Sequence, residues 1–182
     1  GLGQVRYPTA GNAYNEEEAQ PFYVNAPFGI VLVHNGNLTN AHTLKSELFE
    51  IDRRHINTGS DTEVLLNILA HELELAARDL PLTPDEVFKA VAAVHRRLKG
   101  SYAVVALIAG HGLLAFRDPF GIRPLCFGEA ATAEGREVML ASESVAIEGT
   151  GHKLTRDVAP GEAIFIDLEG RVHHQQCAAH PS

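Results

Sequence analysis

The spacing of apolar residues changes near residue 100, and this change limits the folds that the chain can adopt. Between residues 41 and 99 apolar side chains recur at helical intervals, whereas after residue 100 they form short runs separated by tight turns, as strands do. An earlier β-rich run precedes the helices. Strands, then helices, then more strands are typical of an α+β domain in which helices cover sheets.

The first helix is predicted over residues 41–50. Asn40 is placed to act as its N-cap, because an asparagine side chain can accept a hydrogen bond from the free N–H groups of the first turn. Leu44, Leu48 and Phe49 are the side chains that we expect to face inward.

Two capping boxes start two longer helices. Ser60 and Glu63 have the spacing at which each side chain can bond the other's backbone N–H, and apolar residues follow at helical intervals. Residues 83–86 repeat the pattern, with proline at the first helical position, where its missing N–H costs nothing. We expect this last helix to stop just before Gly100.

The strands are predicted from short apolar runs. Residues 1–7 have strand character, and residues 28–34 form a buried strand that we expect to end abruptly at Asn35 and Gly36. Later candidates are residues 101–109, 112–117, 123–127, 138–142, 162–167 and 171–176. Because the chain starts in mid-strand, it is interpreted as a fragment.

Charge and composition exclude several classes of function. The formal net charge is −8, and phosphate recognition needs a clustered Lys/Arg surface, so a nucleic acid is not an expected partner. No apolar run approaches the roughly 20 residues of a membrane span, and residues 1–30 lack the apolar core of a signal peptide. Two cysteines do not make a disulfide framework, so a cytoplasmic location is expected.

Histidines near the C-terminus invite assignment as metal ligands, but their spacing argues against it. His173 and His174 are adjacent in a predicted strand and therefore point to opposite faces. Together with Cys177 and His180 they do not match the spacing of a tetrahedral zinc site. No metal ligand is assigned.

Six segments resemble, in their order along the chain, the glutaminase domain of the amidophosphoribosyltransferases. These are N-terminal-nucleophile glutamine amidotransferases that open de novo purine biosynthesis. The segments are residues 5–11, 34–38, 60–63, 116–125, 141–144 and 157–162. Sugar-phosphate amidotransferases share some of these features but usually carry a tryptophan after the arginine of the first segment, and this chain has no tryptophan.

The resemblance implies a fold and a domain organisation. The fold is the four-layer α/β/β/α sandwich of the N-terminal-nucleophile hydrolases, here missing its first strands. Residues 1–182 are then a fragment comprising the glutamine amidotransferase domain, and the phosphoribosyltransferase domain of the same polypeptide is absent. No cofactor is expected in this fragment, whereas Mg²⁺ is expected in the absent domain.

The activity implied for the intact enzyme is glutamine hydrolysis that supplies ammonia to phosphoribosyl pyrophosphate and gives 5-phosphoribosylamine. Two alternatives stay open: the glutaminase domain of a sugar-phosphate amidotransferase, and a non-catalytic regulatory module that binds glutamine. A homo-oligomer is expected, because missing strands leave sheet edges that can pair with a second copy.

Asn35 and Gly36 resemble the oxyanion hole of the family. The Asn35 side-chain NH₂ and the Gly36 backbone N–H would donate to the oxygen of the tetrahedral intermediate. Taken alone, an Asn-Gly pair after a strand indicates a tight turn. The turn and the site are compatible interpretations.

Four further residues resemble the glutamine-binding residues of the family. Arg6 would hold the α-carboxylate through two parallel hydrogen bonds, and Asp61 would pair with the α-ammonium group. Tyr7 and Thr9 would contribute to the pocket wall. Arg6, Thr9 and Asp61 have plainer alternatives; an aspartate in a first helical turn, for example, is favoured by the helix dipole whatever its function.

The nucleophile of the family is a cysteine at the mature N-terminus, whose α-amino group can act as the base. It lies in a segment that this chain does not contain, and Cys126 and Cys177 are interpreted as inert thiols. The fragment is therefore expected to be inactive as a glutaminase. Residues 117–125 are interpreted as a turn that packs between strands, without a catalytic role.

Overall fold

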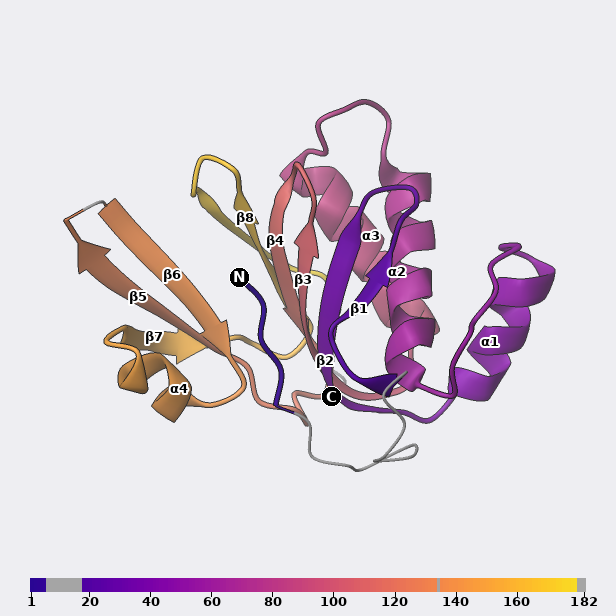
Figure 1. The fold of residues 1–182 in the computed structure, drawn as a ribbon, viewed down its shortest axis with the longest axis horizontal. Helices are drawn as coiled ribbons and strands as arrows, with labels where there is room; N and C mark the ends of the chain where they lie inside the picture. Colours follow the sequence, from indigo (N-terminus) through magenta and orange to yellow (C-terminus); the bar gives the residue numbers. More distant parts are fainter. Residues whose placement is uncertain (6–17, 134, 180–182) are drawn as a thin grey trace.

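Two antiparallel sheets form the centre of the computed structural model, which describes residues 1–5, 18–133 and 135–179 (Figure 1). Within these residues the larger sheet has the strand order β1-β2-β3-β4-β8-β9. Its strands are β1 (Phe22–Val24), β2 (Ile30–Leu38), β3 (Gly100–Ile108), β4 (Gly112–Arg117), β8 (Glu162–Asp167) and β9 (Val172–Gln176). The smaller sheet has the order β6-β5-β7, from β5 (Cys126–Thr132), β6 (Gly135–Ala141) and β7 (Lys153–Asp157).

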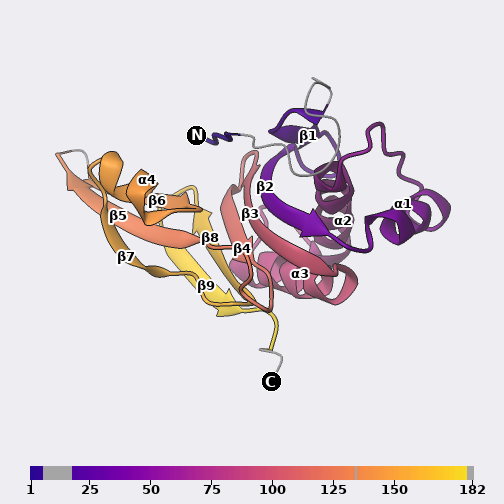
Figure 2. The same cartoon turned by 90° about the horizontal axis from the view of Figure 1, so that it is seen from below.

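Helices cover the outer faces of both sheets. α2 (Asp61–Ala76) and α3 (Pro84–Arg97) lie side by side against the larger sheet, and α1 (Ala41–Glu50) lies beyond α2 (Figures 1 and 2). On the other side of the molecule, α4 (Ser144–Gly149) packs on all three strands of the smaller sheet. The layers therefore follow the order α/β/β/α, which confirms the predicted α+β sandwich.

Each face of the larger sheet has its own hydrophobic core, and β3 contributes to both. Tyr102, Val104 and Ala106 point into the core shared with α2 and α3. Ala103 and Val105 belong to the core shared with the smaller sheet. Successive residues of a strand point to opposite faces, so a strand buried on both sides needs apolar residues at nearly every position.

The two predicted capping boxes differ in the structure. The box over residues 83–86 is complete at the start of α3. At α2, Ser60 accepts a hydrogen bond from the Thr62 N–H, but the Glu63 carboxylate accepts from residues 57–58 instead of returning to Ser60. Glu63 thus ties the preceding loop to the helix, and the second half of this box was wrongly predicted.

α1 has its predicted bounds, but Asn40 does not cap it. The Asn40 amide donates to the Arg97 carbonyl and accepts from the Lys99 N–H, so it fastens the start of α1 to the end of α3. The two predicted inward leucines are buried, whereas Phe49 is 57% exposed. Position 49 is one residue further round the helix than the buried stripe, so the prediction for Phe49 was wrong.

Several strand predictions need correction. Residues 1–5 lie outside any strand, so the predicted opening strand is absent there, and the rest of that segment lies outside the described residues. β5 begins at Cys126 instead of residue 123, because a turn occupies the preceding residues. β1, β7 and α4 were not predicted. β1 has only 3 residues and the 6 residues of α4 span less than two helical turns, whereas β7 has a single apolar residue, Leu154, and therefore no apolar run.

A buried histidine makes a testable contribution to stability. His95 of α3 packs against the rings of Tyr102 and Phe116, with its Nδ1 2.8 Å from the Tyr102 hydroxyl. Burial lowers the pKa of His95 to about 4, although Asp118 acts in the opposite direction. In the unfolded chain a histidine titrates near pH 6.5, so protonation between these two values favours unfolding.

We therefore expect the free energy of unfolding to fall by roughly 3 kcal/mol through His95 alone as the pH drops from 7 to 4. Urea unfolding of the wild type and of His95→Gln, which cannot titrate, measures this as the difference between two pH profiles. Parallel profiles would contradict a neutral, buried imidazole.

Candidate functional site

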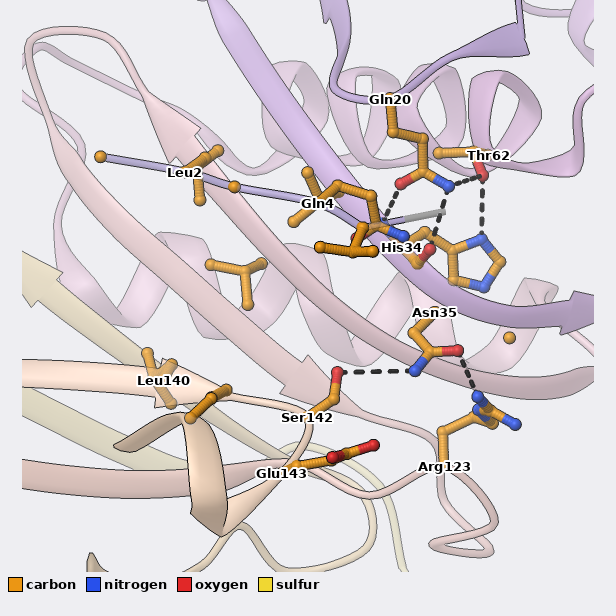
Figure 3. A pocket seen from close by; sticks show the side chains of 18 of the residues that line it. Leu2, Gln4, Gln20, His34, Asn35, Thr62, Arg123, Leu140, Ser142 and Glu143 are labelled. Atoms are coloured by element: carbon orange, nitrogen blue, oxygen red, sulfur yellow. Dashed lines mark hydrogen bonds between the residues drawn. The ribbon is translucent and has the colours of Figure 1, made fainter. Parts of the chain in front are cut away.

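A cavity of about 800 Å³ lies between the two sheets (Figure 3). One wall is formed by β2 and the start of α2, and the opposite wall by the end of β6 and the start of α4; residues 1–5 also line it. Asn35, Gly36 and Asp61 are among the lining residues. The adjacent residues Asn35 and Gly36 of β2 and the more distant Asp61 of α2, which were predicted as one site, thus share one cavity.

Three other predicted site residues cannot be placed. Arg6, Tyr7 and Thr9 lie outside the described residues. Their assignment as a carboxylate clamp and as pocket wall stays a prediction.

β2 does not end at Asn35, as the sequence analysis predicted, but continues to Leu38. Asn35 pairs with Ala103 of β3, and Gly36 pairs with Tyr102. Pairing along the whole of β3 keeps this turn-forming pair extended, because tertiary contacts override a weak local preference. The interpretation as a tight turn is wrong: the pair lies on a strand that borders the cavity.

The outer edge of β2 is open near the cavity, since no described strand pairs with it there. Side chains take up the backbone donors instead: the His34 N–H donates to Gln20 Oε1 at 2.6 Å, and the Leu38 N–H donates to Asp61 Oδ2 at 2.9 Å. Alternate residues of a strand direct their N–H groups to the same edge. The register therefore directs the Gly36 N–H to this edge, between those two donors.

The Asn35 side chain points toward the smaller sheet, the opposite direction from His34 (Figure 3). Its Oδ1 accepts a hydrogen bond from Arg123 Nη2, and its Nδ2 lies 3.5 Å from Ser142 Oγ. Arg123 and Ser142 also line the cavity. Both lie in segments that carried the family resemblance, but nothing in their sequence spacing indicated that they meet Asn35.

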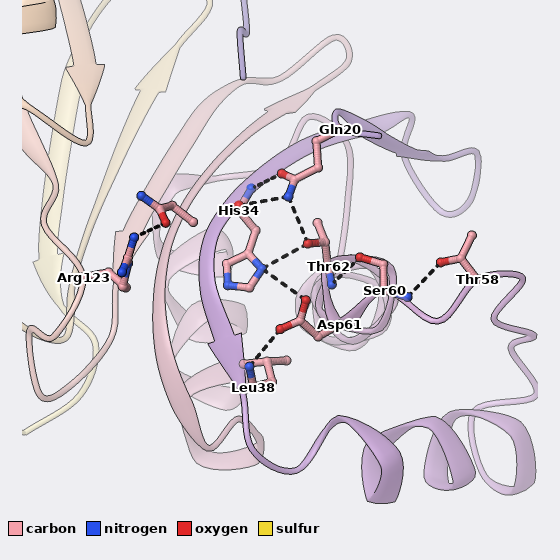
Figure 4. Close-up of polar contacts among 9 residues, drawn as sticks. Gln20, His34, Leu38, Thr58, Ser60, Asp61, Thr62 and Arg123 are labelled. Atoms are coloured by element: carbon pink, nitrogen blue, oxygen red, sulfur yellow. Dashed lines mark hydrogen bonds and ion pairs between the residues drawn. The ribbon is translucent and has the colours of Figure 1, made fainter. Parts of the chain in front are cut away.

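Asp61 links β2 to α2 (Figure 4). While its Oδ2 accepts the Leu38 N–H, its Oδ1 lies 3.9 Å from His34 Nδ1, which is 3.1 Å from Thr62 Oγ1. Burial lowers the pKa of His34, although Asp61 raises it, so the imidazole is neutral near pH 7 and does not neutralise the carboxylate. A carboxylate has about four acceptor positions, which leaves Asp61 able to receive an ammonium group.

Neither cysteine lies at the cavity. Cys126 is buried at the start of β5, where its Sγ donates to Asp157 Oδ1 at 3.3 Å, and burial raises the pKa of its thiol. Burial also raises the pKa of Cys177, to about 11. Because the thiolate is the reactive form, the structure agrees with the interpretation of both as inert thiols.

The C-terminal histidines have carboxylate neighbours. His173 Nε2 lies 2.9 Å from Asp167 Oδ2, and His174 Nδ1 lies 3.6 Å from Glu162 Oε1. In the part of the chain that the structure describes, no group of three or more His, Cys, Asp or Glu side chains is arranged to hold a metal ion. Nor is any helix of that part long and apolar enough to cross a bilayer.

A known family has the same sequence pattern. Residues 12–149 match the family described as the glutamine amidotransferase domain. This range includes Asn35, Gly36 and Asp61, the three predicted site residues that the cavity brings together. The chain belongs to this glutamine amidotransferase family. The resemblance drawn from the sequence motifs is thereby confirmed.

Relatives within the family match all or nearly all of the chain. The chain is 58% identical over 182 residues to the amidophosphoribosyltransferase of Escherichia coli (strain K12), and 51% identical over 171 residues to that of Schizosaccharomyces pombe. It covers 36% and 32% of these two proteins, so this glutamine amidotransferase domain spans about a third of the length of such relatives. The sugar-phosphate and non-catalytic alternatives are not better supported.

Solved structures confirm the fold of this glutamine amidotransferase domain. One, described as the allosteric regulatory enzyme of purine biosynthesis, matches 96% of the chain with a TM-score of 0.73 at 32% identity. Another is the glutamine phosphoribosylpyrophosphate amidotransferase from B. subtilis complexed with ADP and GMP, which matches 93% of the chain with a TM-score of 0.68 at 31% identity. The chain covers 34% of each of these longer proteins.

Proposed function

We propose that the cavity between the sheets binds free glutamine, and that Asn35 and Gly36 stabilise the oxyanion formed when its side-chain amide is cleaved. One observation carries the proposal: the Asn35 amide and the β2 edge at Gly36 line the same cavity as the Asp61 carboxylate. Glutamine needs both kinds of group, because its amide oxygen becomes an anion in the intermediate while its α-ammonium group needs a carboxylate.

The remaining contacts to glutamine belong to the same proposal. Arg6 would receive the α-carboxylate as a bidentate partner, with Tyr7 and Thr9 in the pocket wall. These roles are carried over from the family resemblance of residues 5–11.

We propose that the attacking thiol belongs to a cysteine at the mature N-terminus of the complete polypeptide. Neither Cys126 nor Cys177 is among the residues that line the cavity, which supports this assignment. The sulfur adds to the amide carbon, the C–N bond breaks, and ammonia leaves with a proton returned by the terminal amine. Water then cleaves the thioester, which releases glutamate and restores the thiol.

The activity of the whole protein is proposed from its relatives. Ammonia would displace pyrophosphate from phosphoribosyl pyrophosphate, with Mg²⁺, in a phosphoribosyltransferase domain of the same polypeptide, giving 5-phosphoribosylamine. The support is that the chain spans about a third of amidophosphoribosyltransferases more than 50% identical to it. A homo-oligomer in the cytoplasm is part of the same proposal.

The complete polypeptide is expected to release glutamate and pyrophosphate in equal amounts from glutamine and phosphoribosyl pyrophosphate with Mg²⁺. Coupled assays of the two products measure this ratio. Residues 1–182 alone are the control and are expected to release no glutamate, because neither of their cysteines lines the cavity. Glutamine binding without glutamate release by the complete polypeptide would overturn the proposal in favour of a regulatory module.

A further inference from the structure

The loop between β4 and β5 carries the longest segment of the family resemblance, yet the reaction proposed above gives it no role. Asp118 organises this loop from a fully buried position. Its carboxylate accepts hydrogen bonds from four backbone N–H groups, those of Tyr102, Phe120, Ile122 and Arg123. The loop is therefore fastened to β3 and closed on itself.

Arg117 holds the same loop from its other side. Its guanidinium donates to the carbonyl oxygens of Arg123 at 2.6 Å, and of Gly121 and Val158 at 2.7 Å each. The N–H of Arg123 is bonded to Asp118 and its C=O to Arg117, so the backbone of Arg123 is fixed on both sides. Such a scaffold positions the side chain that leaves it.

That side chain ends at the Asn35 amide. Arg123 Nη2 donates to Asn35 Oδ1, while Arg123 Nε is buried and has no hydrogen-bond partner among the described residues. A buried N–H donor without a hydrogen-bond partner costs free energy. The position of the guanidinium is therefore not explained by its own hydrogen-bonding needs. Among the described residues, the hydrogen bond that this guanidinium makes is the one to Asn35.

The contact selects one orientation of the amide. A guanidinium has five donors and no acceptor, so the Asn35 atom that faces Arg123 has to be the oxygen. The other neighbour, the Ser142 hydroxyl, can donate or accept and therefore does not select an orientation. If the amide were reversed, its NH₂ group would face a cation and its oxygen would point at the developing oxyanion.

We propose that Arg123 is a positioning residue for the oxyanion hole, which holds the Asn35 amide so that its NH₂ group points into the cavity. This inference rests on the proposed role of Asn35. The charge of Arg123 also polarises the amide it bonds, which strengthens Nδ2–H as a donor. The loop between β4 and β5, which carries the longest segment of the family resemblance, thereby supports the reaction by orienting Asn35, without contacting glutamine.

The test uses the complete polypeptide with Arg123→Met, which keeps an unbranched side chain but removes the donors and the charge. We expect kcat for glutamine hydrolysis to fall about 10–100-fold, less than the loss of the whole donor group. KM for glutamine should change less than about threefold, because an interaction made in the transition state affects kcat. Arg123→Lys should recover part of kcat, since lysine is also a pure donor.

A double variant separates positioning from a general structural effect. Asn35→Ala combined with Arg123→Met is expected to be no more than about twofold slower than Asn35→Ala alone, because residues acting as a unit are not additive. Additive losses would overturn the proposal. So would a rise in KM with unchanged kcat, which would indicate that Arg123 binds glutamine directly.

Two controls keep the test decisive. Arg136→Met removes an exposed arginine of β6 that pairs with Glu129, and it is expected to keep the wild-type kcat. Thermal unfolding shows whether Arg123→Met folds. If it does not, Arg123→Lys replaces it in the comparison of single and double variants with Asn35→Ala. If Asn35→Ala keeps the wild-type kcat, the proposed function itself is wrong. If Asn35→Ala has a reduced kcat but Arg123→Met keeps the wild-type kcat, only the positioning role of Arg123 is wrong.

Discussion

Replacing Asn35 by alanine in the complete polypeptide is expected to lower kcat for glutamine hydrolysis about 10²–10³-fold, the usual cost of losing one oxyanion-hole donor. The amide of Asn35 is held by Arg123 on one side and lies near Ser142 on the other, so its NH₂ group is placed before the reaction starts. Steady-state release of glutamate measures the loss, and KM for glutamine should stay nearly constant.

Asn37→Ala is the matched control for this experiment. Asn37 lies two residues further along β2, on the same face as Asn35, but it is exposed and does not line the cavity. Its substitution should change kcat less than about twofold, as expected for a surface change away from the site. Equal losses in the two variants would show that the strand, and not the Asn35 amide, limits the rate.

The substitution Gly36→Ala is expected to destabilise the domain by about 4 kcal/mol or more, which only a severe local conflict produces. Gly36 has φ of +150°, and a Cβ at this position would lie 2.0 Å from the Ser101 carbonyl oxygen and 2.9 Å from His34 Nε2. The carbonyl belongs to the backbone of β3, so relief of the clash requires β2 and β3 to separate. A lower midpoint of urea unfolding measures the loss.

Gly135→Ala separates the two causes of this effect. Gly135 of β6 has a similar φ of +132°, but no atom of the described residues lies within 4 Å of the Cβ it would gain. The loss in free energy of unfolding on Gly135→Ala is therefore limited to backbone strain, about 1–3 kcal/mol. If the two variants lose the same stability, the close approach of β2 to β3 at Gly36 is not what excludes a side chain.

The fold was predictable because its signals are local and repeated. The stripe that buries Leu44 and Leu48 and the box over residues 83–86 indicated their helices without reference to any partner. β4 and β8 were found with their observed bounds, since each is a short apolar run between turns. Elements that depend on neighbours, such as β1, gave no such signal.

The candidate site was predictable only in part, for a related reason. The order of motifs identified Asn35, Gly36 and Asp61, and the cavity brings them together. The interpretation of the Asn-Gly pair as a turn was wrong, because pairing with β3 extends the strand through it. Asn40 is a similar case: its amide finds partners at the end of α3 in place of its own helix.

By itself the sequence determined the family, the order of helices and strands, and which residue types could serve a glutaminase. Each of these follows from the local spacing of residues and from the order of motifs. Only the tertiary structure decided that Arg123, from a loop 88 residues away, holds the Asn35 amide. Chain segments distant in sequence meet through the packing of two sheets, and a hydrogen bond forms only where that packing brings donor and acceptor together. Orientation at the site is for this reason a property of the folded chain.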